Sequence, residues 1–313
     1  AWVDQAIAAQ EFDVVTCEHS INEIYVRSDW RSQLTTVVNI HSSVYGTCLN
    51  QLQTRTSAQP WRDRLSLPLL YRYEQRYVQK FDQIVVTTAD DQAQLKQFAP
   101  DCPATVIANG VDLDLFPPRS QDPGGHHLTF IGAMDNLANI DAAQFLGLSV
   151  FPRIRQQYPD ATLSLVGARP TPAVQALAEQ PGITVTGRVP SMVDYLHQAT
   201  VCVIPMRTGF GIKNKTLEAM AAGVPIVASD RGLEGLNLDE VGRLQGALRA
   251  NTVTEYVAAI ARLFENPELR QKLATASRQM IEAEFTWARA GQRYDQALQQ
   301  RSRPDAGTTR RWG

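Results

Sequence analysis

At 313 residues, the chain is long enough for two domains of ordinary size. Charged residues make up 20% of it and apolar residues 44%, proportions that argue against a disordered or membrane-spanning chain. The formal net charge of −2 gives no argument for a nucleic acid or an anionic membrane surface as a partner.

The cysteines and the lack of targeting segments predict a cytoplasmic protein. Cys17, Cys48, Cys102 and Cys202 are far apart, without a C-x-x-C pair or a nearby histidine in metal-ligand spacing, so we expect reduced thiols and no metal site. The sequence contains no apolar run long enough to span a bilayer and no signal peptide. It opens on Ala1 without Met, so either a Met was removed or the front of a longer protein is missing.

Strands alternate with helices in the first half, which predicts a parallel sheet wound on both faces. The predicted strands are Phe12–Cys17, Leu34–Ile40, Gln83–Thr87 and Thr105–Ala108. Residues 51–81 have helical spacing that we expect to break at Pro60 and Pro68, and residues 90–98 form another predicted helix.

A turn at residues 109–112 and a polar, Gly/Pro-rich run over residues 119–126 predict a domain boundary. The second half then repeats the strand–helix alternation. Its predicted strands are Leu128–Ile131, Thr162–Val166, Ile183–Thr186, Val201–Ile204 and Val224–Ala228. Helices are expected over residues 139–158, 172–179 and 191–197, and residues 252–300 are almost wholly helical around a break at Asn266-Pro267.

The stretch from Val201 to Ser229 carries the clearest functional signal. Gly209-Phe210-Gly211 separates a buried strand from a helix that is expected over residues 214–222. A loop that opens a helix offers free backbone N–H groups and the positive end of the helix dipole, which favour an anion. Lys213 and Lys215 add positive charge, and Glu218 shares a helix face with Lys215. Cations for phosphates beside one carboxylate for ribose suit a nucleotide diphosphate.

A structural interpretation of these residues stays open. Lys215 and Glu218 at positions i and i+3 form a pair that is worth only about 0.2–0.5 kcal/mol when it is exposed. In favour of a site, the flagged residues all follow predicted parallel strands, at whose carboxyl ends the ligands of doubly wound sheets bind. These residues are His41, Gly132, Gly167, Gly187 and the loop 209–218.

The sequence 218–228, EAMAAGVPIVA, resembles the signature of family 4 of the retaining glycosyltransferases with the GT-B fold. Asn109-Gly110-Val111-Asp112 is similar to that family's hinge motif, and Phe285-Thr286-Trp287 to its closing segment. Residues 130–135, FIGAMD, with Asn139, resemble a bacterial subgroup associated with exopolysaccharide synthesis.

The resemblance implies an α/β fold of two Rossmann-like, doubly wound parallel-sheet domains facing a cleft. The first, residues 1–117, would take the acceptor and be incomplete at its N-terminus. The second, residues 118–284, would bind the donor. Residues 285–300 would form a helix that crosses back to the first domain, and residues 301–313 a disordered tail.

The resemblance further implies a hexosyltransferase that moves a sugar from a nucleotide-diphosphate sugar, as co-substrate, to a hydroxyl acceptor. Transfer would proceed with retention and without a metal or other cofactor. The acceptor would be a glycan or a lipid-linked precursor, peripheral membrane association is allowed, and no nucleic acid is expected as a partner.

Site residues carry over from the family position by position. Glu218 matches the carboxylate that binds ribose, and Gly187-Arg188 the strand end at the base. Gly209, Gly211 and the amides up to Asn214 match the loop on the diphosphate and donor sugar. His41 matches a histidine near the reaction centre, although a strand-end histidine is often satisfied by local backbone. Gly132 ends the first strand of the donor domain.

Two departures from the family pattern affect the expected site. Phe210 stands where the family usually has a second Glu, so the sugar-hydroxyl contact of that Glu is not assigned. Residues 133–150 contain no basic residue, whereas many members have an Arg and a Lys there to neutralise the diphosphate. An unpaired diphosphate in a cleft is costly, so Lys215, Lys213 and Arg207 are the candidate cations, with Lys215 ranked first and assigned a catalytic role with His41.

Two alternatives stay open: a catalytically incomplete module that binds a sugar nucleotide, and a sugar-nucleotide epimerase of the same fold. A nicotinamide-dependent oxidoreductase is disfavoured, because Gly132 is the only glycine in residues 131–140 and the G-x-G-x-x-G pattern is missing. The donor sugar, its base and the acceptor are not specified by the sequence, because pocket shape decides them.

Overall fold

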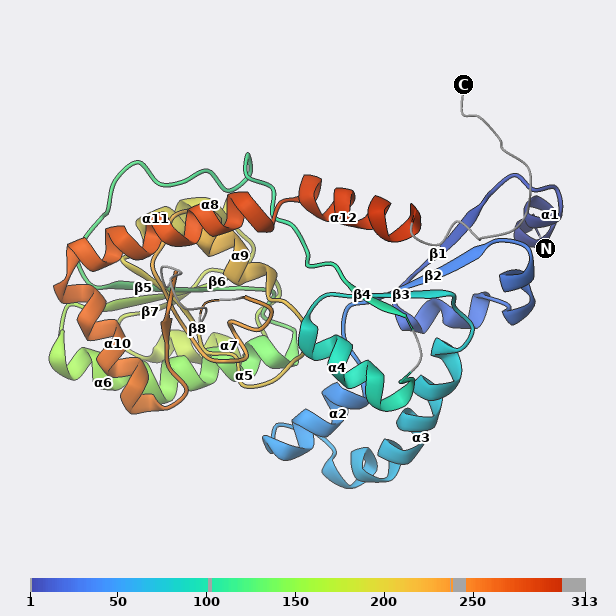
Figure 1. Cartoon of the computed structure of the whole chain (residues 1–313). Coiled ribbons are helices and arrows are strands. Elements are labelled where there is room, and N and C mark those ends of the chain that lie inside the picture. The colour runs from blue at the N-terminus through green and yellow to red at the C-terminus, as the bar shows by residue number, and fades with distance from the viewer. Residues whose placement is uncertain (1, 101–102, 237, 239–245, 300–313) are drawn as a thin grey trace.

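A computed structural model describes residues 2–100, 103–236, 238 and 246–299 of the chain. The predicted disordered tail, residues 301–313, lies outside these described residues. Two parallel β-sheets, each covered by helices, form the two halves of the molecule (Figure 1). The α/β fold class expected from the sequence is therefore confirmed.

The first sheet has four parallel strands in the order β1-β2-β3-β4. Strands β1 and β2 pair in parallel, and their register places Val14 opposite Thr35. The strands are β1 (Val14–Glu18), β2 (Thr35–Ile40), β3 (Gln83–Val86) and β4 (Ala104–Val106). The helices around them are α1 (Trp2–Ala8), η1 (Ser20–Tyr25), η2 (Ser28–Ser32), α2 (Val44–Gln53), α3 (Pro60–Val78) and α4 (Ala89–Phe98).

Helix α3 runs through Pro68, so the break predicted there is wrong. Pro68 has no amide to donate to the carbonyl of Arg64, and it lies on the exposed side of the helix, where water can hydrate that carbonyl. Helix α2, which the sequence pattern did not separate, begins at Val44 after the N-cap Ser43, whose side chain accepts from the amide of Gly46.

The second sheet has six parallel strands in the order β10-β9-β8-β5-β6-β7. The strands are β5 (His127–Ile131), β6 (Thr162–Val166), β7 (Ile183–Val185), β8 (Val201–Ile204), β9 (Ile226–Ala228) and β10 (Leu248–Arg249). The two-residue β10 was not predicted. Strand order reverses between β5 and β8, which creates a crevice at their carboxyl ends.

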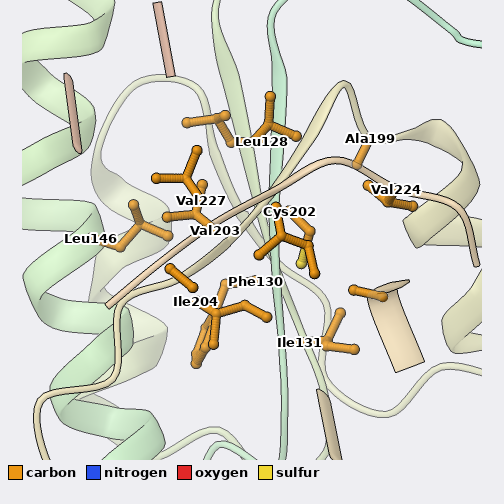
Figure 2. Close-up of a cluster of buried hydrophobic side chains, with 14 of the residues drawn as sticks. Leu128, Phe130, Ile131, Leu146, Ala199, Cys202, Val203, Ile204, Val224 and Val227 are labelled. Atoms are coloured by element: carbon orange, nitrogen blue, oxygen red, sulfur yellow. The ribbon is translucent and has the colours of Figure 1, made fainter. Parts of the chain in front are cut away.

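The core of this domain lies between the sheet and its helices (Figure 2). Leu128 and Phe130 of β5 and Ile204 of the neighbouring strand β8 are fully buried, and Leu146 packs on them from the helical layer. The helices are α5 (Leu137–Phe145), η3 (Leu146–Val150), α6 (Phe151–Gln157), α7 (Pro172–Gln175), η4 (Ala176–Glu179), α8 (Met192–Gln198), α9 (Asn214–Ala221), α10 (Val253–Glu265) and α11 (Pro267–Glu284). A π-turn at η3 joins α5 to α6, just before Pro152, which has no amide to donate.

The chain crosses between the domains twice, and the two crossings lie side by side. At the first, the amide of Val111 donates to the carbonyl of Phe285 at 2.8 Å. The second leads into α12 (Trp287–Gln299), which extends over the first domain (Figure 1). Ala297 and Tyr294 of α12 pack there against Val37 and Val85.

Candidate active site

A cavity of about 600 Å³ lies between the two domains. The first domain contributes residues that follow β2 and β3 and residues of α2: His41, Ser42, Thr47, Gln51 and Thr87. The second contributes the start of α5 and the loop that leads from β8 into α9: Asn136, Leu137, Ala138, Asn139, Met206, Thr208, Gly209, Phe210, Ile212, Lys213, Asn214 and Lys215. Loops at the carboxyl ends of both sheets therefore face one space.

The two domains touch at this cavity. A Cβ on Gly211, whose φ is +78°, would lie 2.5 Å from the carbonyl oxygen of His41, so only glycine permits the approach. Asn109 in the crossing segment donates to Asn214 at the start of α9, with 3.0 Å between Nδ2 and Oδ1. The structure thus brings His41, Gly211 and Asn214 together, as the sequence led us to expect.

The loop before α9 presents its amides without partners. In the described part of the chain, no group accepts a hydrogen bond from the backbone amides of Gly209 through Asn214. Lys213 occupies the N-cap position of α9 and provides no side-chain cap. Since unpartnered amides and a helix N-terminus together favour a negative charge, this loop has the chemistry of an anion site.

Lys215 brings a positive charge to the same point. Its ammonium donates to Oδ1 of Asn139 and lies 4.7 Å from the centre of the Phe130 ring. Asn139 is itself held by a 2.8 Å bond from its Nδ2 to the carbonyl of Ala133. Burial lowers the pKa of Lys215 to about 7, although the nearby charge of Glu218 opposes the shift.

Two glycines at neighbouring strand ends permit close contacts beside this ammonium. A Cβ on Gly132, at the end of β5, would lie 2.8 Å from Nζ of Lys215. A Cβ on Gly167, at the end of β6, would lie 1.8 Å from the carbonyl oxygen of Gly132. Gly132 therefore leaves room for the ammonium of Lys215, and Gly167 lets the ends of β5 and β6 approach each other.

The other two candidate cations are already paired. Lys213 donates to the carbonyl of Gly211 and forms an ion pair with Glu234 at 3.2 Å. Its side chain therefore holds the loop against residues of its own domain. Arg207 forms an ion pair with Asp141 and is absent from the wall of the 600 Å³ cavity. Its expected role at the diphosphate stays a prediction, and in this structure its guanidinium lies against Asp141.

Three further predicted residues lie outside the cavity wall. Glu218 is one turn beyond Lys215 on α9, and burial raises the pKa of its carboxyl, against the effect of Lys215. Gly187 and Arg188 follow β7, at the edge of the sheet, with open space where a Cβ on Gly187 would lie. The structure therefore does not bring these three residues to the cavity, and their roles in nucleotide binding stay predictions.

His41 lies where two cavities meet. It also lines a cavity of about 300 Å³ under α12, together with Glu18, Asn39 and Tyr294. Its Nε2 is 3.6 Å from Oε2 of Glu18, and the hydroxyl of Tyr294 donates to Asn39 at 3.1 Å.

Sequence reasoning missed two contributors and left one position unexplained. Glu18 directly follows a predicted strand, as His41 does, and this position at a strand end is the signal that could have identified it. Asn139 figured only in a family motif, although it is the partner of Lys215. Phe210, at the position of the second family Glu, lines the cavity, and the guanidinium of Arg231 lies 4.3 Å from its ring centre.

Within the described residues, no group of three or more His, Cys, Asp or Glu side chains is arranged to hold a metal ion. The helices among those residues include none with the length and apolar character that crossing a membrane requires.

Two parallel-sheet α/β domains that face one cleft are the architecture of the GT-B class of proteins. Residues 1–115 match the family model described as Glycosyltransferase Family 4, and residues 125–266 match the model described as Glycosyl transferases group 1. Each half of the chain therefore matches a glycosyltransferase domain model.

Relatives and solved structures agree with this class. The glycogen synthase of Mycobacterium tuberculosis is 26% identical over 235 residues, which are 70% of this chain and 54% of that protein. A mannosyltransferase of Corynebacterium glutamicum, named as GDP-mannose-dependent and acting on a monoacylated phosphatidylinositol monomannoside, is 26% identical over 63% of this chain and 56% of its own length. The chain thus spans about half the length of these relatives.

Among solved structures, sucrose-phosphate synthase from Thermosynechococcus elongatus matches with a TM-score of 0.73 and 20% identity, over 95% of this chain and 76% of that one. HepE of Anabaena, solved with UDP-glucose, matches with a TM-score of 0.69 and 14% identity, over 95% and 82%. At these identities, the matches show the fold alone.

Proposed function

We propose that this chain transfers a sugar from a nucleotide-diphosphate sugar to a hydroxyl acceptor. The observation that carries the proposal is the buried ammonium of Lys215 beside the unpartnered amides of residues 209–214, across a cavity from His41. That combination suits a diphosphate leaving group whose negative charge grows as the bond to the sugar breaks.

Each part of the cleft has a role in this proposal. The loop amides and Lys215 hold the diphosphate, and Glu218, one turn further along α9, takes the ribose. The acceptor enters from the first domain, where His41 and the residues around it place its hydroxyl against the sugar. Where the donor sugar would lie, Phe210 provides an aromatic ring in place of the carboxylate that the family usually has.

Retention of anomeric configuration, independence of metal ions, a hexose donor and a role in exopolysaccharide synthesis also belong to this proposal. Their support is the family resemblance of residues 218–228 and 130–135 together with the group 1 and family 4 matches. The acceptor class, a glycan or a lipid-linked precursor, is supported by the names of relatives that act on such acceptors.

A panel of nucleotide sugars, headed by UDP-glucose and GDP-mannose, tests the proposal through release of the nucleoside diphosphate with mixed acceptors present. Transfer followed by NMR of the new linkage reads the anomeric configuration. Binding of UDP or GDP without turnover would favour the second candidate, a sugar-nucleotide binding unit. Epimerised donor in the absence of any acceptor would favour an epimerase. A chain that binds no nucleotide would contradict all three.

A further inference from the structure

Helix α3 carries an exposed apolar ridge, which consists of Trp61, Leu65 and Leu69. Residues four apart lie on one helix face, so these three side chains form a single line. Their exposed fractions are 78%, 78% and 65%. Isolated exposed apolar residues are common on protein surfaces, whereas apolar residues that gather on one exposed face are typical of protein or membrane contact sites.

Positive charge continues the same line. Arg72 and Arg76 follow the ridge at helical spacing, Arg62 and Arg64 flank it, and all four are exposed. The guanidinium of Arg64 lies 5.5 Å from the ring centre of Trp61.

The acidic residues of α3 are occupied elsewhere. Glu74 is buried, where it accepts a 2.7 Å hydrogen bond from Ser43, and Asp63 accepts one from Ser57. Residues 44–80 contain six basic and two acidic residues, whereas the whole chain has a net charge of −2. The exposed face of α3 is therefore apolar at its start and cationic towards its end.

The ridge is also close to the cleft. Helix α3 packs on α2, and Thr47 and Gln51 of α2 line the 600 Å³ cavity. In Figure 1, α2 and α3 lie together on one side of the first domain, below its sheet. A surface bound along α3 would therefore lie next to the side of the cavity formed by the first domain.

We propose that the α3 ridge binds the surface of a membrane that contains anionic phospholipids. Trp and Leu side chains enter the boundary between headgroups and acyl chains, while arginines on the same face meet the phosphates. A nucleic acid would use the arginines but leaves the aliphatic Leu65 and Leu69 without a partner. A membrane bound along α3 would bring a lipid-linked acceptor next to the cavity, and this corollary rests on the proposed function. The vesicle binding itself does not depend on the transfer reaction.

The test is co-sedimentation of the whole chain with vesicles of phosphatidylcholine, alone or mixed with phosphatidylglycerol. We expect binding to the mixed vesicles that weakens with salt and is much weaker on phosphatidylcholine alone. The variant Arg72→Gln/Arg76→Gln should lower the partition coefficient by about fivefold per arginine. The variant Trp61→Ser/Leu65→Ser/Leu69→Ser should lower it by at least about tenfold.

Matched controls are Leu115→Ser and Leu148→Ser, which remove exposed leucines (66% and 53% exposed) away from α3 and should leave binding unchanged. Because the replaced side chains are exposed, thermal melts should confirm that every variant remains folded. The proposal is overturned if the wild type binds neither vesicle, or if the triple variant binds as well as the wild type. It is equally overturned if the ridge variants only dissociate a dimer, as seen by sedimentation velocity, without any change in vesicle binding. These outcomes do not depend on turnover, so failure of the transfer reaction would be seen separately.

Discussion

Replacement of Lys215 by methionine removes the buried ammonium while keeping a side chain of similar length. Lys215 has a pKa of about 7, so its charge is present in most molecules one pH unit below that value and in few molecules one unit above it. If the diphosphate binds only the protonated form, affinity for UDP falls about tenfold between roughly pH 6 and pH 8. Bound diphosphate stabilises the ammonium, so binding should take up a proton near neutral pH.

The assay is isothermal titration calorimetry with UDP, or GDP if UDP does not bind, at several pH values and in buffers of different ionisation enthalpy. At the acid end, Lys215→Met should bind about ten- to a hundredfold more weakly, the loss of a hydrogen bond to a charged group. The nucleotide has its own phosphate titration, so the informative quantity is the ratio of wild-type to variant affinity. Lys96→Met, which changes an exposed lysine on α4 outside the cavity wall, is the matched control.

Stability provides an independent check on the role of Lys215. The unfolded lysine keeps its proton up to about pH 10.5 and the folded one only to about 7, so the unfolded chain binds more protons between these values. Lys215 therefore makes the free energy of unfolding rise with pH across that window, and it opposes folding most at pH 7 and below. Lys215→Met should be at least as stable as the wild type there. A variant that is unstable but binds UDP with the wild-type pH profile would refute the reasoning.

Three further predictions follow from the same geometry. Glu218→Gln should weaken UDP binding about tenfold without loss of thermal stability, since a neutral amide replaces a buried carboxyl; unchanged affinity in calorimetry would remove it from the nucleotide site. Arg207→Ala should leave UDP affinity within about twofold, because the guanidinium of Arg207 forms a partly exposed ion pair with Asp141 outside the cavity wall. A large loss of affinity would contradict that placement. Gly167→Ala should lower the free energy of unfolding by roughly 2–3 kcal/mol or more in urea titrations, as its Cβ would lie 1.8 Å from the carbonyl oxygen of Gly132; a wild-type midpoint would show that the strand ends can separate.

The sequence predicted the elements whose pattern is local. Strands such as Thr162–Val166 and Val201–Ile204 have the predicted bounds, because short apolar runs ended by turn residues suffice to define them. The break at Pro68 was wrong because hydration of one exposed carbonyl is a matter of surface position, which helical spacing does not report.

The site was predictable in its residue types and less so in its charges. Lys213, Lys215 and Arg207 are alike as sequence letters, and their differences arise from partners that are distant along the chain. Asp141 is 66 residues from Arg207, and Glu234 is 21 residues from Lys213. Periodicity cannot assign such pairs, so only the folded chain shows that Lys213 and Arg207 are ion-paired.

The two neighbouring crossings between the domains have a consequence for how the cleft can open. Val111 and Phe285 are hydrogen-bonded to each other, and a Cβ on Gly110 would lie 2.3 Å from the amide nitrogen of Trp287. The two interdomain segments are therefore packed together as a single hinge. Because both segments cross at one place, we expect the domains to rotate about this hinge rather than to slide past each other. A cleft that opened about this hinge would close with Gly211 back against the carbonyl of His41, so under the proposed function the hinge would fix how the donor loop meets the first domain.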